Sequence, residues 1–187
     1  MADRGATVLL VIDIQNFYFE GGRLALAGPG EASRNARRLL DRFREHGWPV
    51  IHVQHLPEGV DAPCPDSGDP ATRVRPDVLP LPGELVVVKH HANAFRGTGL
   101  QGALGEFGAV RLVICGMQTH MCVEAAARAG ADLGFAVTVV HDACATRAVG
   151  FGGVEAPAPH VHATALAAIA NMYGRVVSTE ELLAEMP

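Results

Sequence analysis

The chain alternates short apolar runs with amphipathic stretches, and this alternation limits the fold more than any other feature. The runs are rich in β-branched residues and almost continuously apolar, as in ATVLLVID (6–13) and AVRLVICG (109–116). Strands that are apolar on both faces need cover on both faces, which is typical of a parallel sheet with helical crossover connections. The sequence therefore predicts an α/β fold, a three-layer α/β/α sandwich around a mostly parallel, Rossmann-like sheet of about six strands.

The expected elements follow from this pattern. Strands are expected at 6–13, 48–54, 84–90, 109–116, 135–142 and 175–178. Helices are expected at 31–46, 97–107, 120–133, 160–173 and 179–185, the last one beginning after Ser178 or Thr179 as N-cap. Segment 56–83 is rich in proline and lacks periodicity, so we expect a loop over the edge or mouth of the sheet. The glycine- and proline-rich segment 148–160 is expected to cover a pocket or to form a subunit contact.

Length and composition limit the class of protein. With 187 residues and 49% hydrophobic residues, the chain is expected to form a single domain over 1–187. A net charge of −5 with scattered basic residues argues against a nucleic-acid surface. The first apolar run meets Asp13 too early for a signal peptide or a membrane span. Four cysteines without a CxxC pair indicate reduced thiols, so we expect a cytoplasmic protein.

Polar side chains stand where several predicted strands end. Asp13 ends the first strand, Lys89 ends the third, and Cys122 follows the fourth. The carboxyl ends of parallel strands meet at one edge of a sheet, where ligands bind in such folds. The same edge is expected to hold Gln54, His55, the segment 116–122 and Asp142.

Cys122 is expected in the first turn of the helix that follows the fourth strand. Free backbone N–H groups and the helix dipole favour an anion there, and a helix N-terminus or a nearby cation lowers a thiol pKa from about 8.5. The same N–H groups are suited to an oxyanion hole. Together with Asp13 and Lys89, the residues supply a nucleophile, a base and an electrostatic stabiliser.

Each of these residues also has a purely structural interpretation. A buried cysteine is usually a small hydrophobic side chain, and we expect this of Cys115 and Cys144. Asp13 alone suits a helix cap or a structural acceptor, with Lys89 as its ion-pair partner. Three reactive groups at the carboxyl ends of strands together favour catalysis.

The segments VIDIQNFYF, VVVKHHANAF and VICGMQTHMCVEAAARAGADLGFAVTVVHDACAT resemble the isochorismatase-like cysteine hydrolase superfamily. This superfamily includes nicotinamidases, N-carbamoylsarcosine amidases and streptothricin hydrolases. The resemblance runs from about residue 6 to residue 178. Its most specific part is the pattern G-x-x-T-x-x-C-V, formed here by Gly116, Thr119, Cys122 and Val123.

The resemblance implies an Asp13–Lys89–Cys122 catalytic triad. In this scheme Asp13 takes the thiol proton, Lys89 supports the thiolate and orients Asp13, and Cys122 attacks a carbonyl to form a thioester. Water then hydrolyses the thioester, with Asp13 serving again as acid and base. The resemblance also implies a cis peptide between Met117 and Gln118. The backbone N–H groups of Gln118 and Cys122 would then form the oxyanion hole.

The resemblance departs from the nicotinamidases at their metal site. These enzymes carry Asp-x-His at the end of the second strand, where this chain has His55 and Pro57. We therefore expect no metal and no cofactor, and nicotinamide is a poor candidate substrate. His52 and His55 are three apart on a strand, so their side chains should point to opposite faces. The remaining histidines of this kind are expected at the surface, near the site or on substrate: His90, His91, His160 and His162.

The cysteine also bears on the reaction class. The superfamily branch that cleaves a vinyl ether does not use a cysteine nucleophile, so Cys122 favours the amide-cleaving branch. The expected substrate is a small molecule with an amide, imide, lactam or carbamoyl C–N bond. Relatives are commonly dimers or tetramers, so the resemblance implies a homodimer or homotetramer.

Candidate substrate contacts are Phe19, His55, Phe95 and Gln118. The chain has only ten aromatic residues, and several stand near the carboxyl edge, which suggests pocket walls. The alternative is that half of the group Phe17, Tyr18, Phe19 and Phe95 packs beneath loops.

Three other functions are less well supported. GTGLQG (97–102) matches G-x-G-x-x-G, but it does not directly follow a strand, so dinucleotide binding is not expected. A thiol-based redox-responsive or ligand-binding protein would not need Asp13 and Lys89, although Cys115 lies seven positions before Cys122 and such sensors often have a resolving cysteine. An inactive scaffold is disfavoured by the intact set of three residues.

Overall fold

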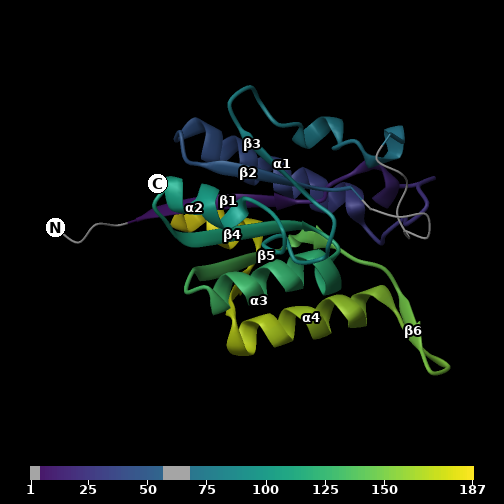
Figure 1. Cartoon of the computed structure of the whole chain (residues 1–187). Coiled ribbons are helices and arrows are strands. Elements are labelled where there is room, and N and C mark those ends of the chain that lie inside the picture. The colour runs from purple at the N-terminus through teal and green to yellow at the C-terminus, as the bar shows by residue number, and fades with distance from the viewer. Residues whose placement is uncertain (1–4, 57–67) are drawn as a thin grey trace.

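The computed structural model describes residues 5–56 and 68–187. Its main feature is a six-stranded sheet in the order β3-β2-β1-β4-β5-β8, in which every neighbouring pair is parallel (Figure 1). The strands are β1 (Ala6–Ile12), β2 (Val50–His55), β3 (Leu85–Lys89), β4 (Ala109–Met117), β5 (Ala136–Ala145) and β8 (Gly174–Val177). The predicted parallel α/β fold is confirmed, and each expected strand is present within a few residues of its predicted bounds.

Helices cover both faces of this sheet, as the apolar strands require. Along β1, Leu9 and Val11 pack into one core cluster with α1 (Pro29–Glu45) and α5 (Thr179–Glu185). The alternate residues Val8 and Leu10 pack into a second cluster with α2 (Leu100–Glu106), α3 (Glu124–Asp132) and α4 (Ala158–Met172). Because successive side chains of a strand point to opposite faces, the two clusters are the two sides of the sandwich. Among the described residues, no helix is long and apolar enough to span a membrane.

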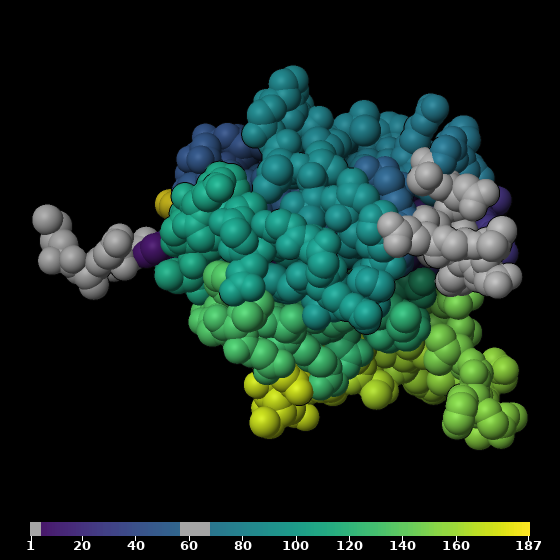
Figure 2. All heavy atoms as spheres, viewed as in Figure 1, coloured from purple at the N-terminus to yellow at the C-terminus, as the bar shows by residue number. Residues whose placement is uncertain are grey.

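A β-hairpin that the sequence analysis did not predict lies within segment 148–160. Strands β6 (Val149–Phe151) and β7 (Val154–Ala156) are antiparallel and project from the body of the molecule (Figures 1 and 2). Gly152 and Gly153 form the two-residue turn with φ angles of 59° and 81°. A Gly-Gly pair between apolar residues is a recognised hairpin signal, and it was available in the sequence. The side chain of Phe151 at the tip is 92% exposed.

The described part of segment 56–83 is more ordered than the predicted loop. It contains two short 3₁₀ turns, η2 (Pro70–Thr72) and η3 (Pro76–Val78). Val74 forms an isolated β-bridge with Gln15, just beyond β1, so this part lies at the carboxyl edge of the sheet as predicted. Residues 57–67 of the predicted loop lie outside the described residues.

A close approach between β1 and β4 sets the position of Asp13. Gly116 pairs with Ile12 and has a φ angle of 130°, and a Cβ at this position would lie 1.9 Å from the Ile12 carbonyl oxygen. Asp13 follows with a φ angle of 51°, in the left-handed region that side-chain-bearing residues rarely adopt. A backbone strained in this way is typical of functional sites.

We expect Gly116→Ala to destabilise the protein by about 2–6 kcal/mol, because left-handed strain and overpacking each cost about 1–3 kcal/mol. Urea unfolding at neutral pH measures the change. Gly134→Ala is the matched control, since Gly134 also has a positive φ of 92° but has no atom near its Cβ position. Equal losses for the two variants would show that the contact with Ile12 is unimportant.

Candidate active site

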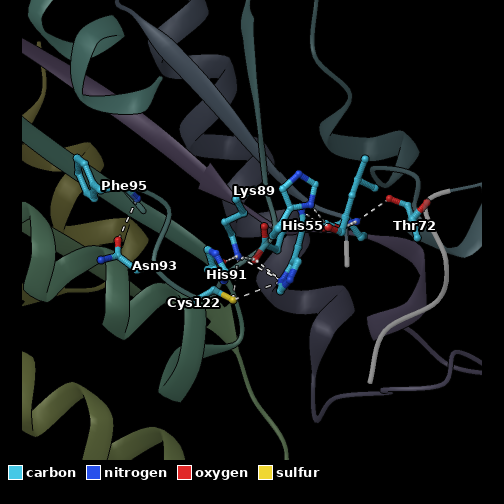
Figure 3. Close-up of polar contacts among 11 residues, drawn as sticks. His55, Thr72, Lys89, His91, Asn93, Phe95 and Cys122 are labelled. Carbon is cyan, nitrogen blue, oxygen red and sulfur yellow. Dashed lines mark hydrogen bonds and ion pairs between the residues drawn. The ribbon is translucent and has the colours of Figure 1, made fainter. Parts of the chain in front are cut away.

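The structure brings Asp13, Lys89 and Cys122 together at the carboxyl edge of the sheet. Figure 3 shows Lys89 and Cys122 meeting there. The Lys89 ammonium lies 2.8 Å from Asp13 Oδ2 and donates a hydrogen bond of 3.1 Å to the Cys122 sulfur. Asp13 and Lys89 are fully buried, and Cys122 is 3% exposed. A carboxylate, an ammonium and a thiol therefore lie together away from solvent. Their positions after the strands predicted that they would meet at this edge of the sheet.

The Lys89 side chain remains charged in this buried position. Burial acts to lower its pKa, but Asp13 and the Cys122 sulfur outweigh that effect and raise the pKa above its usual value. Lys89 also donates a hydrogen bond of 3.0 Å to the backbone oxygen of His91. A lysine at the end of the valine-rich β3 is therefore held by acceptors from three separate segments.

Cys122 occupies a different local structure from the one predicted. Residues Thr119–Val123 form one π-helical turn, and the regular helix α3 begins only after it. Burial and the neighbouring Asp13 carboxylate raise the pKa of the Cys122 thiol, and Lys89 opposes them without compensating. The predicted lowering of this pKa is therefore wrong, because burial outweighs the nearby cation. The resting sulfur is a neutral thiol that needs a base to become a nucleophile.

Two hydrogen bonds fix the turn that carries the sulfur. Thr119 Oγ1 and His162 Nδ1 of α4 are 2.9 Å apart, and His120 Nδ1 lies 2.5 Å from Thr146 Oγ1 just beyond β5. Thr119 belongs to the sequence motif and His162 was among the histidines expected near the site, whereas the supporting role of Thr146 was missed. Their positions follow from the packing of α4 and β5 against the turn, which no local pattern reports.

Gln118 immediately precedes this turn. The peptide bond between Met117 and Gln118 is cis, as the family resemblance implies. The Gln118 side chain is mostly buried, and its Oε1 has no hydrogen-bond partner within residues 5–56 and 68–187. A polar group in this state is available to a ligand. The oxyanion-hole and substrate-binding roles of Gln118 stay predictions.

His55 forms part of the same cluster and is positioned by a residue that the sequence analysis missed. Its Nδ1 lies 3.3 Å from Lys89 Nζ and 4.0 Å from the Cys122 sulfur. The buried Gln15 side chain forms two hydrogen bonds of 2.9 Å with the His55 backbone, one through each amide atom. Gln15 also donates to the backbone oxygen of Thr72 at 2.6 Å, so it ties the end of β2 to η2. Gln15 follows the first apolar run directly, and that placement was the available signal.

The cluster includes a possible set of metal ligands, but its charge is unsuitable for a metal ion. Ligand atoms of Asp13, His55 and Cys122 lie within 4.8 Å of one another. However, the Lys89 ammonium lies within 3.3 Å of an atom of each of them, and so occupies the place that a cation would take. A divalent ion there would meet strong repulsion in a desolvated space. The absence of a metal requirement stays a prediction.

His52 has a separate, structural environment. Its Nε2 lies 2.9 Å from Glu84 Oε2, and Arg44 binds the same carboxylate through Nε at 2.7 Å and Nη2 at 2.8 Å. These contacts lie away from His55, in keeping with the prediction that the two side chains point to opposite faces. Arg44, the Leu81 backbone N–H and His52 hold Glu84 in its charged form, and the pKa of its carboxyl falls to about 2 although burial acts in the opposite direction.

The aromatic residues divide between core and surface contacts. Phe17 and Tyr18 are buried in the core beside α1, which supports the alternative that part of this group packs beneath loops. Phe19 stacks beneath the Arg75 guanidinium at 4.2 Å. Phe95 lies near α3, with its ring centroid 6.4 Å from that of Phe135. Substrate contacts by Phe19 and Phe95 stay predictions.

Other residues of the carboxyl edge are structural. Asp142 accepts hydrogen bonds of 2.7 Å from the backbone and the hydroxyl of Thr179, so it stabilises the start of α5. Gln54 donates to the backbone oxygen of Thr72 at 3.0 Å. Cys115 and Cys144 are buried in the core, as predicted. Cys64 lies outside the described residues.

Comparison with known proteins agrees with this fold. Residues 7–181 match the isochorismatase domain. The uncharacterised isochorismatase family protein YddQ of Bacillus subtilis is 44% identical over 177 residues, which cover 95% of this chain and 98% of that protein. A crystal structure of an isochorismatase-family protein from Oleispira antarctica superimposes with a TM-score of 0.93 at 41% identity, covering 98% and 99% of the two chains. Streptothricin hydrolase of Streptomyces noursei is 37% identical over 140 residues, 74% of this chain and 49% of that enzyme.

The family match and the match to YddQ cover nearly the whole chain, and the match to streptothricin hydrolase covers 74% of it. The fold is the isochorismatase-like α/β fold, and members of this family are hydrolases. The chain belongs to the isochorismatase family.

Proposed function

We propose that the protein is a cysteine hydrolase that cleaves a C–N bond of a small molecule, in an amide, imide, lactam or carbamoyl group. The observation that carries the proposal is the contact of the buried Lys89 ammonium with two buried groups. The Asp13 carboxylate lies 2.8 Å from Lys89 Nζ, and the Cys122 thiol lies 3.1 Å from it. Streptothricin hydrolase, a relative over three quarters of this chain, gives the reaction class further support.

The proposed reaction begins with proton transfer from the Cys122 thiol to Asp13, because the thiol is neutral at rest. The sulfur attacks the substrate carbonyl, and the backbone N–H groups of Gln118 and Cys122 stabilise the oxyanion. Asp13 returns the proton to the leaving nitrogen, and the C–N bond breaks to leave a thioester on Cys122. Lys89 keeps Asp13 oriented and balances its charge.

The alternative of a thiol-based redox sensor has less support. Cys115 packs in the core cluster beside α1, whereas Cys122 packs in the cluster on the opposite face of the sheet. Cys115 is therefore not placed to form a disulfide with Cys122. Sensor cysteines also have a low pKa and an exposed sulfur, and Cys122 has neither property.

We further propose that the partner of this site is a small molecule, and that the protein acts in the cytoplasm as a homodimer or homotetramer. The projecting β6–β7 hairpin, with the exposed Phe151 at its tip, suits a subunit contact (Figure 2). Sedimentation velocity of the purified protein tests the oligomeric state directly.

A substrate panel tests the proposed function. Small amides, imides, lactams and carbamoyl compounds are incubated with the protein, and released ammonia or amine is measured. We expect turnover of at least one class, and the rate should survive EDTA treatment because the Lys89 ammonium occupies the centre of the cluster. Hydrolysis that EDTA abolishes and zinc restores would contradict the cysteine mechanism.

A further inference from the structure

We propose that His55 is the general base that activates water in the second half of the reaction, the hydrolysis of the thioester. This inference rests on the proposed function, since it assigns a residue to one step of that mechanism. Two different bases then act in the two steps. Asp13 accepts the proton of the thiol when the thioester forms, and His55 accepts the proton of water when the thioester is hydrolysed.

The first argument is the number of donors on Lys89. An ammonium has three N–H groups, but four acceptors surround this one. They are Asp13 Oδ2 at 2.8 Å, the His91 backbone oxygen at 3.0 Å, the Cys122 sulfur at 3.1 Å and His55 Nδ1 at 3.3 Å. Because His55 Nδ1 is the farthest of the four, it is the acceptor whose lone pair is least committed.

The second argument is access to solvent. The side chains of Asp13 and Lys89 are fully buried, whereas the His55 side chain is 16% exposed. His55 is therefore the base of this cluster that both reaches the sulfur and opens toward solvent.

The third argument is the protonation state of His55. The charged and titratable groups that face it are Lys89, Asp13, Cys122 and His90. Burial lowers the pKa of His55, and the Lys89 charge lowers it further, while Asp13 and a hydrogen bond to the His90 backbone oppose them. His55 is thus neutral at pH 7. Nδ1 lies 3.3 Å from the Lys89 ammonium, which can only donate, so Nδ1 is the acceptor of this contact and carries no proton.

The geometry suits a water molecule between His55 and an acyl group on the sulfur. The distance from Nδ1 to the Cys122 sulfur is 4.0 Å, and a water hydrogen-bonded to Nδ1 at about 2.8 Å would approach the carbonyl carbon of a thioester. Nδ1 accepts a proton from water as the hydroxide oxygen bonds to the carbonyl carbon. The C–S bond then breaks, the sulfur receives the proton from the imidazolium, and the acid product leaves. Gln15 fixes the His55 backbone throughout.

A two-phase assay with p-nitrophenyl acetate tests this role. Release of nitrophenolate in the first phase reports formation of acetyl-Cys122, and the steady state reports its hydrolysis. For His55→Gln we expect an unchanged first phase and a steady-state rate that falls by about 10²-fold or more, because general bases contribute about 10²–10⁴-fold. Acetyl-Cys122 should accumulate in this variant, as measured by peptide mass spectrometry. His46→Gln, an exposed histidine at the end of α1, is the control and should behave as the wild type.

Two further readouts separate catalysis from a structural effect. The wild-type steady-state rate should be full above pH 6.5 and should fall as the pH drops through the lowered pKa of His55, whereas His55→Gln should lack this dependence. In His55→Ala, added imidazole should restore the second phase. A first phase that slows as much as the second, or a wild-type pH profile in His55→Gln, would overturn the inference while leaving the proposed function intact. A wild-type protein that forms no acetyl-Cys122 would overturn both.

Discussion

Cys122→Ala should lower kcat/KM for the C–N substrate by a factor of about 10⁴ or more, since removal of a covalent nucleophile leaves only binding and electrostatic stabilisation. The sulfur accepts a hydrogen bond from Lys89 but makes few other polar contacts, so the fold should persist. The measurement is the rate of amine release, together with circular dichroism to confirm the native structure.

Cys144→Ala is the matched control for this experiment. Cys144 is also a buried cysteine on the same side of the sheet, in the same core cluster as Cys122. Its removal should reduce stability by about 1–2 kcal/mol, as for a small core side chain, and should leave kcat within a few-fold of the wild type. Equal activity of the two variants would show that Cys122 has no special role in the reaction.

Lys89→Met should reduce both activity and stability. The variant leaves the fully buried Asp13 carboxylate without its counter-ion, and breaking a buried ion pair in this way costs about 3–5 kcal/mol. Hydrolysis should fall by about 10²-fold or more, because Asp13 would lose the partner that orients it toward the thiol. Urea unfolding at pH 7.5 and amine release measure the two effects.

The double variant Asp13→Asn/Lys89→Met separates charge from packing. It removes both members of the pair, so it should recover a large part of the stability lost in Lys89→Met while remaining inactive. If the single and double variants are equally destabilised, the loss comes from packing of the lysine stem instead of the unpaired carboxylate.

The parallel sheet was predictable because its signal is local. Each strand is a short apolar run, and the runs at 6–13 and 109–116 require cover on both faces. The β6–β7 hairpin was missed because glycine and proline in segment 148–160 suggested an irregular loop, although Gly152–Gly153 carried the signal of a tight turn. The π-helical turn at Thr119–Val123 was read as ordinary helix, since its residues are compatible with both.

The three reactive residues of the site were predictable from their position at the ends of strands. Asp13, Lys89 and Cys122 each follow an apolar run, and a parallel sheet places such residues at one edge. The direction of the Cys122 pKa could not be obtained in this way. It depends on how deeply the sulfur is buried and how near Asp13 lies, and both are results of tertiary packing.

Supporting residues were missed for a related reason. Gln15 holds the His55 backbone from 40 positions away, and Thr146 contacts His120 from 26 positions away. No periodicity or spacing rule connects residues at such separations. For His55 the sequence predicted only a contact with substrate. A role in proton transfer is suggested by the distances from His55 to Lys89 and Cys122, which the sequence does not contain.

Peptide mass spectrometry after acid quenching during turnover of a C–N substrate tests the central claim most directly. The claim is that Cys122 forms a thioester with the acyl part of the substrate. We predict that the peptide containing Cys122 gains the mass of that acyl group, that hydroxylamine removes it, and that Cys122→Ala shows no adduct. Turnover without an adduct on Cys122, or with the acyl group on another residue, would contradict the account.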